Sequence, residues 1–208
     1  VIGSRGLSTE LGDLAEAVAG FLGGAPIVRV PGRSHPVEVT HALGRSAADA
    51  VRDVAGRDGG HVLVFLPGAP EIRRAVAELA GAALEERHGV RVLPLHGGIG
   101  AEEQDAALAP SGRRKVILAT NVAETSLTVD GVTDVIDGGQ HKVMRYDASR
   151  GLDRLELERI PADSAEQRKG RAGRTGPGRV LRLWDERDRL RPRREPEIGR
   201  VDLAGPVL

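Results

Sequence analysis

The residues with the clearest chemical meaning lie in one stretch, which reads Gln167-Arg-Lys-Gly-Arg-Ala-Gly-Arg174. Asp163 precedes it, with Glu166 three positions on, and this pattern predicts a helix that begins at Asp163. On such a helix Gln167, Arg171 and Arg174 fall at i, i+4 and i+7, so they share one face. Guanidinium groups are well suited to bidentate phosphate contacts, and this face therefore predicts binding of a polyanion.

Two glycines inside the predicted helix, Gly170 and Gly173, bear on the alternative that it is a solvated basic helix. Glycine in a helix interior costs about 1 kcal/mol relative to alanine. Two such residues are expected where the chain approaches another surface closely. We therefore favour a binding helix packed against a neighbour over a solvated one.

A second polar segment follows a predicted buried strand. Val116–Ala119 is a short apolar run typical of such a strand, and Thr120 and Asn121 follow it directly. Open α/β sheets bind ligands at the carboxyl ends of their strands, which predicts a ligand contact for both residues. The alternative is a capping turn that binds nothing.

Four segments together resemble a known family. Ala119-Thr-Asn-Val-Ala-Glu-Thr-Ser-Leu-Thr-Val-Asp-Gly131 resembles helicase motif V, and Gln167–Arg174 resembles motif VI, of the DEAH/RHA group of superfamily 2 helicases. Val62-Leu-Val-Phe-Leu-Pro-Gly68 is similar to motif IV, and Leu95-His-Gly97 to the motif that follows it. The four segments occur in the family's order. The sequence Phe-Leu-Pro-Gly in motif IV, with Arg-Leu-Trp184 after motif VI, is most similar to that of the bacterial HrpB-type branch.

The order of the predicted elements agrees with this resemblance. Short apolar runs alternate with amphipathic stretches, which predicts crossover units and a mainly parallel sheet. The resemblance implies an α/β, RecA-like (P-loop NTPase-like) fold with helices on both faces. Partial period-two patterning in two further segments predicts a short antiparallel hairpin. The expected strands are 27–30, 37–41, 61–66, 90–95, 114–119, 132–137 and 179–184. The expected helices are 11–22, one from Ser46, 69–87, 101–109 and one from Asp163, and the hairpin is 142–147 with 152–160.

The resemblance also implies a division of the chain. Residues 25–190 match the second RecA-like lobe, residues 1–24 the tail of the first lobe or a linker, and residues 191–208 the start of a truncated helical domain. The family's Ser-Ala-Thr motif precedes this lobe, but here the chain reads Val1-Ile-Gly-Ser-Arg-Gly-Leu7. The phosphate-binding loop and the Asp-Glu-x-His motif do not occur in these 208 residues.

Those missing motifs supply the triphosphate cradle and the magnesium ligands. We therefore expect the full-length protein to be an ATP-dependent helicase and this chain alone to be inactive. ATP and Mg²⁺ would be bound mainly by the first RecA-like lobe of the same polypeptide. No metal site is predicted within this chain.

Roles for individual residues follow from the resemblance alone. Arg171 and Arg174 are expected to be the arginine fingers of ATP hydrolysis, and Gln167 to position the attacking water or the γ-phosphate. Thr128 and Asp130 would face the nucleotide and its hydrated magnesium ion. Arg168 and Lys169 are expected to be structural or electrostatic.

Leu108 occupies the position where many relatives place an aromatic residue that stacks on the nucleotide base. An aliphatic side chain stacks less well, so weak base selectivity is expected. Thr120, Asn121 and Gly97 are expected to contact the sugar-phosphate backbone of a single strand without reading bases. That strand is RNA or DNA, and the family favours RNA. His96 receives no role.

Composition limits the remaining possibilities. The chain has no cysteine, which excludes disulfides and thiolate metal sites. No apolar run reaches membrane-spanning length and no secretory signal opens the chain, so we expect no membrane association and a cytoplasmic location. The resemblance to the HrpB-type branch implies that this cytoplasm is bacterial. The formal net charge is zero, but 166–194 holds eleven Lys/Arg against four Asp/Glu. Its last part, Arg187–Arg194, is predicted to be a solvated tail.

Two other function classes stay open. The first is a nucleic-acid-binding or scaffold module that retains only the second lobe and does not hydrolyse ATP. The second is a different two-lobed motor, such as a chromatin or restriction translocase. The motif V sequence Asn-Val-Ala-Glu-Thr-Ser-Leu-Thr argues against this second class.

Overall fold

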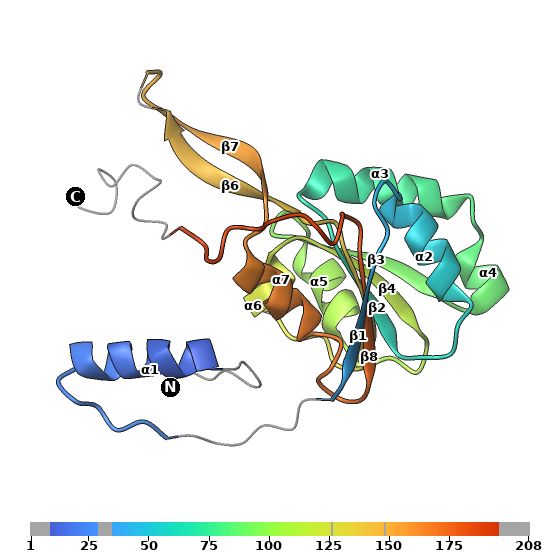
Figure 1. Ribbon diagram of the computed structural model, residues 1–208. Coiled ribbons are helices and arrows are strands. Elements are labelled where there is room, and N and C mark those ends of the chain that lie inside the picture. Colours follow the sequence, from blue (N-terminus) through green and yellow to red (C-terminus); the bar gives the residue numbers. More distant parts are fainter. Residues whose placement is uncertain (1–8, 29–34, 126, 148, 196–208) are drawn as a thin grey trace.

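The structure is a computed structural model that describes residues 9–28, 35–125, 127–147 and 149–195 (Figure 1). Helix α1 (Thr9–Phe21) matches the helix expected at 11–22. Of the strand expected at 27–30, Ile27 and Val28 have no regular secondary structure, and residues 29 and 30 lie outside the described residues.

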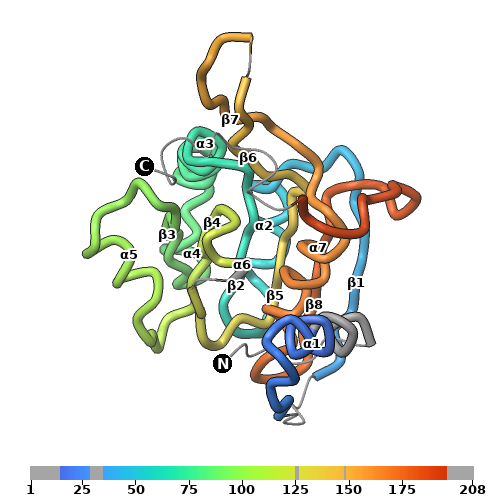
Figure 2. Tube along the Cα trace, turned by 90° about the vertical axis from the view of Figure 1, so that its left-hand side faces the viewer, coloured from blue at the N-terminus to red at the C-terminus, as the bar shows by residue number. Residues whose placement is uncertain are grey.

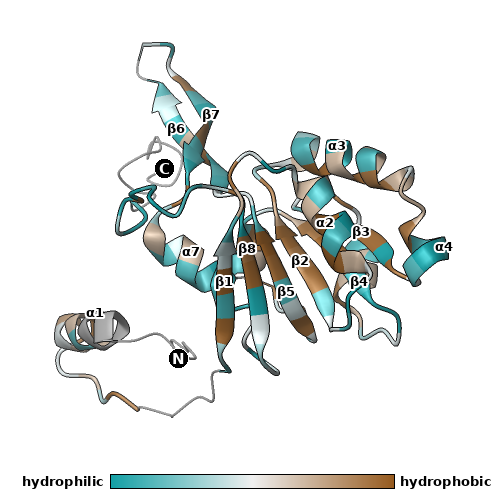
Figure 3. Ribbon diagram, turned by 45° about the vertical axis from the view of Figure 1, so that its right-hand side comes forward, coloured by the Kyte–Doolittle hydropathy of each residue, from teal (hydrophilic) through white to brown (hydrophobic). Residues whose placement is uncertain are grey.

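A six-stranded parallel sheet forms the centre of the fold, with the strand order β1-β8-β5-β2-β4-β3. Its middle strands are buried, as expected of runs rich in Val, Ile and Leu (Figure 3). The strands are β1 (Val37–His41), β2 (His61–Phe65), β3 (Arg91–Leu95), β4 (Lys115–Ala119), β5 (Val132–Asp137) and β8 (Gly178–Arg182).

Helices cover both faces of this sheet, each over its own apolar cluster. On one face α2 (Ala47–Ala55), α3 (Ala69–Ala80) and α4 (Leu84–His88) pack against β2, β4 and β5. On the other face α5 (Ala101–Leu108) and the short α6 (Val122–Thr125) pack on the same strands. The predicted α/β class, a mainly parallel sheet with helices on both faces, is therefore confirmed.

The prediction of a single helix at 69–87 is wrong. Two helices occupy this stretch, and the chain turns between them at Ala83, whose φ of 47° lies in the left-handed region. Helix α3 ends at the C-cap Gly81, and α4 begins after Ala83. The break redirects the chain so that Leu84, which is 5% exposed, packs into the apolar cluster beneath α2 and α3.

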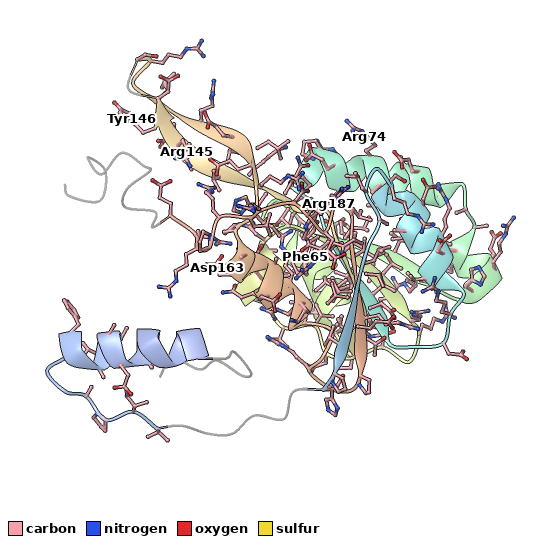
Figure 4. All side chains as sticks on the ribbon, in the orientation of Figure 1. Phe65, Arg74, Arg145, Tyr146, Asp163 and Arg187 are labelled. Carbon is pink, nitrogen blue, oxygen red and sulfur yellow. The ribbon has the colours of Figure 1, made fainter. Side chains whose placement is uncertain are left out.

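An antiparallel hairpin, β6 (Gln140–Asp147) with β7 (Leu152–Arg159), projects from the sheet in both views (Figures 1 and 2). It confirms the predicted hairpin. Figure 4 shows Arg145 and Tyr146 along its length. Gly139 at its base has a φ of 70°, and a Cβ there would lie 2.5 Å from the Trp184 ring, so the turn into the hairpin requires glycine.

The helix that carries motif VI differs from the prediction at both ends. Helix α7 runs from Ala162 to Lys169, with Pro161 rather than Asp163 at the N-cap. It ends at Gly170, whose N–H donates to the Glu166 carbonyl at 2.9 Å. Arg171 and Arg174 therefore lie in the turn after the helix, and the predicted shared helical face with Gln167 is wrong.

The expected close approach holds for one of the two glycines. A Cβ at Gly173 would lie 2.7 Å from Val37 Cγ2 and 3.0 Å from the His35 carbonyl oxygen, so this turn packs directly on the start of β1. A Cβ at Gly170 would meet only helix carbonyl oxygens at 3.4 Å, which is ordinary contact. Gly170 therefore acts as a helix terminus and not as a point of close approach.

Candidate nucleotide and nucleic-acid site

Residues 119–131, here called the motif V segment, connect β4 to β5. At its start the Thr120 N–H donates to the Leu95 carbonyl at 3.2 Å, which joins the carboxyl ends of β4 and β3. Gly97 lies in the turn after β3, so the structure brings the predicted nucleic-acid residues Thr120, Asn121 and Gly97 to one edge of the sheet. His96 has a local role there, because its Nδ1 accepts the Gly98 N–H at 3.1 Å.

The far end of the motif V segment lies at the opposite edge. The Gly131 carbonyl accepts the His61 N–H at 2.7 Å, where β2 begins. Thr128 and Asp130 are exposed and precede this end. The predicted nucleotide contacts are thus separated from the predicted nucleic-acid contacts by most of the segment.

One contact joins the exposed parts of the two motifs. Arg174 Nη1 donates to Thr128 Oγ1 at 3.1 Å, and both residues are exposed. The contact joins a guanidinium and a hydroxyl, which are both hydrogen-bond partners for phosphate oxygens. The structure therefore brings Arg174 and Thr128 together at the surface.

Arg171 has different surroundings from Arg174. It is 5% exposed, and its Nη1 donates to the Leu127 carbonyl at 3.0 Å while its Nη2 donates to the Glu124 carbonyl. Burial, followed by the nearby charge of Arg174, lowers the pKa of Arg171 to about 10, so it stays protonated at neutral pH. Arg171 thus fixes the backbone of the motif V segment.

Beneath this surface lies a buried ionic network around Arg168. Arg168 Nε donates to Glu124 Oε1 at 2.7 Å and Nη1 to Asp137 Oδ1 at 2.6 Å, and the Phe65 ring packs against the guanidinium with Cζ 4.7 Å from its centroid. Burial raises the pKa of Asp137, although Arg168 opposes this. Burial also acts to lower the pKa of Arg168, but Asp137 and Glu124 outweigh it, so that pKa is raised. The contacts agree with the structural role expected for Arg168.

Sequence reasoning missed Glu124. The buried carboxylate belongs to α6, which is not among the helices expected from the sequence. Nothing in its spacing distinguishes a buried glutamate from a solvated one, because its arginine partner is 44 positions away. The only available signal was its place between an apolar strand and the hydroxyl-rich part of motif V.

Two further predicted residues lie around this centre. Gln167 is half-buried on α7, next to Arg168 and ahead of the helix end. Leu108, at the end of α5, is partly buried and packs with Leu127 against the apolar cluster that contains Ala172.

Two arginines of the predicted solvated tail pair with carboxylates of the lobe, although residues 191–195 are exposed as expected. Arg194 Nη2 donates to Glu124 Oε2 at 2.5 Å and to Ser164 Oγ at 3.0 Å. Arg191 Nη2 donates to Glu158 Oε2 at 2.6 Å. Buried or half-buried carboxylates hold these arginines against the lobe, whereas the side chain of Arg187 is 89% exposed.

This sheet order, the two-faced helical cover and the polar segments at the strand ends define a RecA-like lobe of helicase type. A family model described as the helicase conserved C-terminal domain matches residues 34–176. The chain belongs to this family. The prediction of a second lobe from a DEAH/RHA-type helicase, similar to HrpB, is confirmed.

Individual relatives agree. The ATP-dependent RNA helicase HrpB of Escherichia coli is 40% identical over 195 residues, covering 88% of this chain and 24% of that protein. The probable ATP-dependent RNA helicase DHX34 of Mus musculus is 41% identical, covering 88% of this chain and 18% of that protein. A crystal structure of the Escherichia coli DEAH/RHA helicase HrpB has a TM-score of 0.82 at 38% identity, covering 92% of this chain and 26% of that chain. This chain therefore spans about a quarter, or less, of these relatives.

Two kinds of feature are absent from the described residues. None of their helices is long and apolar enough to cross a membrane. Within the same part of the chain, no three His, Cys, Asp or Glu side chains gather in a way that could hold a metal ion.

Proposed function

We propose that this chain is the second motor lobe of an ATP-dependent RNA helicase, in which Arg174 acts on ATP and the Thr120–Asn121 edge holds a single strand. The observation that carries the proposal is the Arg174–Thr128 contact of 3.1 Å, which joins motif VI to motif V at the surface. The relatives' names, ATP-dependent RNA helicase, support the activity and the choice of RNA.

Arg174 and Arg171 would contribute differently. The guanidinium of Arg174 is exposed, and it would stabilise negative charge that develops on the phosphate oxygens as ATP is cleaved. Arg171 is the second predicted finger, but its described donors bind the carbonyls of Leu127 and Glu124. To act on phosphate directly, Arg171 would have to exchange those carbonyls for phosphate oxygens when the two lobes close.

The residues present fit part of an ATP site. Arg174 and Thr128 suit phosphate oxygens, Gln167 suits a water or a phosphate, and Asp130 suits a hydrated cation. No group of three metal ligands occurs among the described residues, so we propose that the first RecA-like lobe of the same polypeptide supplies most of the magnesium ligands. ATP with Mg²⁺ would then bind between the lobes.

The nucleic-acid edge suits a backbone and not bases. Thr120 and Asn121 offer a hydroxyl and an amide, and the exposed Gly97 offers a backbone N–H without a side chain in the way. Such groups bind phosphate and sugar oxygens but carry no sequence information. A single strand held in this way fits a motor that moves along any sequence. We also propose that the full-length helicase is located in a bacterial cytoplasm.

The test uses the full-length protein. Arg174→Ala is expected to lower RNA-stimulated ATP turnover by about 10³-fold or more, because an arginine finger acts chiefly on developing charge. Binding of a non-hydrolysable ATP analogue should weaken far less than turnover does. Arg187→Ala, which removes an exposed arginine paired with Asp185, is the matched control and should change neither quantity.

Two results would contradict the proposal. Loss of ATP binding with unchanged turnover per bound ATP would make Arg174 a ground-state contact. A full-length wild-type protein that binds RNA but never hydrolyses ATP would instead favour the non-hydrolysing binding module. The 208-residue chain alone is expected to show no turnover, because the phosphate-binding loop is not part of its sequence.

A further inference from the structure

The carboxylate of Glu124 lies between two arginines from distant parts of the chain. Its Oε1 accepts from Arg168 Nε at 2.7 Å and its Oε2 from Arg194 Nη2 at 2.5 Å. The Arg168 side chain is fully buried, whereas that of Arg194 is 38% exposed. One partner therefore belongs to the core, and the other reaches the carboxylate from the surface.

The main chain of Glu124 connects the two proposed binding regions. Its N–H donates to the Asn121 carbonyl at 2.9 Å, and its carbonyl accepts from Arg171 Nη2. Arg171 also holds the Leu127 carbonyl at 3.0 Å, directly before Thr128. The position of Glu124 thus sets the spacing between the single-strand edge and the nucleotide-facing residues.

Helix α6, which contains Glu124, depends on such contacts for its shape. It has only four residues, Val122–Thr125, and a helix that short is not stable by itself in water. Its geometry is fixed by packing of Ala123, which is 1% exposed, and by the two arginines on Glu124. Removing one arginine leaves one buried oxygen without its partner and frees the carboxylate to turn about the other.

The segment Arg191–Glu195 is held so that Arg194 meets this carboxylate. The Ala162 N–H donates to the Arg191 carbonyl at 2.8 Å, and the Arg194 N–H donates to Asp163 Oδ2 at 3.1 Å. Figure 4 shows Asp163 at the start of α7. These two hydrogen bonds dock the segment beside α7.

We propose that Arg194 is a positioning residue of the motor, which holds Glu124 so that strand binding at Thr120–Asn121 raises ATP turnover at Arg174. This inference rests on the proposed function. It makes the segment Arg191–Glu195 a control point, because displacement of the segment removes Arg194 from Glu124 and loosens the motif V segment.

The test compares two arginines of the same segment in the full-length protein. Arg194→Gln removes the contact with Glu124, whereas the control Arg191→Gln removes an ion pair of similar length, to Glu158, that does not involve motif V. Arg194→Gln should lower the RNA-stimulated turnover about fivefold while the turnover without RNA changes by less than about twofold. Arg191→Gln should leave both within about twofold.

Two further variants separate positioning from general support of the fold. Arg194→Lys restores a charge but not the guanidinium geometry, and it should recover part of the RNA stimulation. The double variant Glu124→Gln with Arg194→Gln should have the same RNA-stimulated turnover as Glu124→Gln alone. Both substitutions act on the same Arg194–Glu124 contact, so their effects should not add. Equal loss of basal and stimulated turnover in Arg194→Gln, loss of the same size in Arg191→Gln, or additive losses would each overturn the proposal.

A second measurement is independent of ATP hydrolysis. Hydrogen exchange at the amides of residues 121–125 should be about fivefold faster in Arg194→Gln than in Arg191→Gln, because Arg194 no longer holds Glu124 of α6. Unchanged exchange would overturn the positioning role even in an active helicase. If the wild-type protein showed no RNA-stimulated turnover, the proposed function would fail, and the exchange comparison would still decide whether Arg194 holds Glu124.

Discussion

Arg168 binds Glu124 inside the protein, with 2.7 Å between Nε and Oε1, although the two residues are 44 positions apart in the sequence. The contact joins motif VI to motif V behind the surface on which Arg174 meets Thr128. A second carboxylate, Asp137 at the end of β5, binds the same guanidinium at 2.6 Å. These contacts therefore connect the two motifs in the core, behind the exposed groups of Arg174 and Thr128.

The first prediction concerns the stability that this contact provides. Arg168→Met should lower the free energy of unfolding by about 3–5 kcal/mol, because it leaves two buried carboxylates without their shared partner. Lys169→Met is the matched control, since Lys169 is the next residue of α7 and pairs with the half-exposed Glu166. Its effect should stay below about 1 kcal/mol. Urea unfolding of both variants measures the difference, and similar losses would show that the buried network is not a major source of stability.

The second prediction concerns the turn after α7. Gly173→Ala should destabilise the fold by about 1–3 kcal/mol, because its Cβ would overlap Val37 Cγ2 at 2.7 Å and no flexible side-chain end can move aside. Gly176→Ala lies in the same turn, where a Cβ would meet nothing within 4 Å, and it should be close to neutral. Thermal unfolding compares the pair. Equal melting temperatures would mean that β1 shifts readily to admit the methyl group.

The third prediction concerns pH. Burial, followed by the charges of Arg194 and Arg168, lowers the pKa of His141 to about 4 from its usual 6.5. The native state therefore favours neutral His141. Above pH 6.5 the residue contributes no pH dependence, and as the pH falls towards 4 the unfolded chain takes up the proton first, so stability is lost.

The size of this loss at pH 4 is roughly 3 kcal/mol, since one pKa unit corresponds to about 1.4 kcal/mol. His141→Leu should remove this part of the pH dependence, because leucine does not titrate. The substitution breaks no described hydrogen bond, since neither ring nitrogen has a hydrogen-bond partner among the described residues. Urea unfolding at several pH values between 4 and 7 measures both proteins. Parallel curves would show that His141 does not titrate in this way.

The sequence was sufficient for the six strands of the sheet, because strands such as Val62–Phe65 and Val116–Ala119 are short, continuous apolar runs, which are typical of buried strands. The same criterion also predicted a strand at 27–30, where Ile27 and Val28 have no regular secondary structure. It was insufficient for the ends of helices. Gly170 could be read as an interior residue, and only the packing of Gly173 on β1 shows why the chain must turn there. Chemistry that depends on contacts between distant residues, such as Arg194 with Glu124, has no local pattern to read.

The last prediction concerns the nucleic-acid edge. Thr120→Ala with Asn121→Ala, in the full-length protein, should weaken single-strand binding and reduce unwinding per ATP hydrolysed. The salt dependence of binding should barely change, because that slope counts cations on phosphates and both side chains are neutral. Binding should also stay independent of base sequence, since these groups do not reach base edges. Filter binding across a salt series with homopolymer competitors measures both properties. A double variant that binds and unwinds as the wild type does would show that Thr120 and Asn121 only form the turn into α6, where their carbonyls already accept the N–H groups of Ala123 and Glu124.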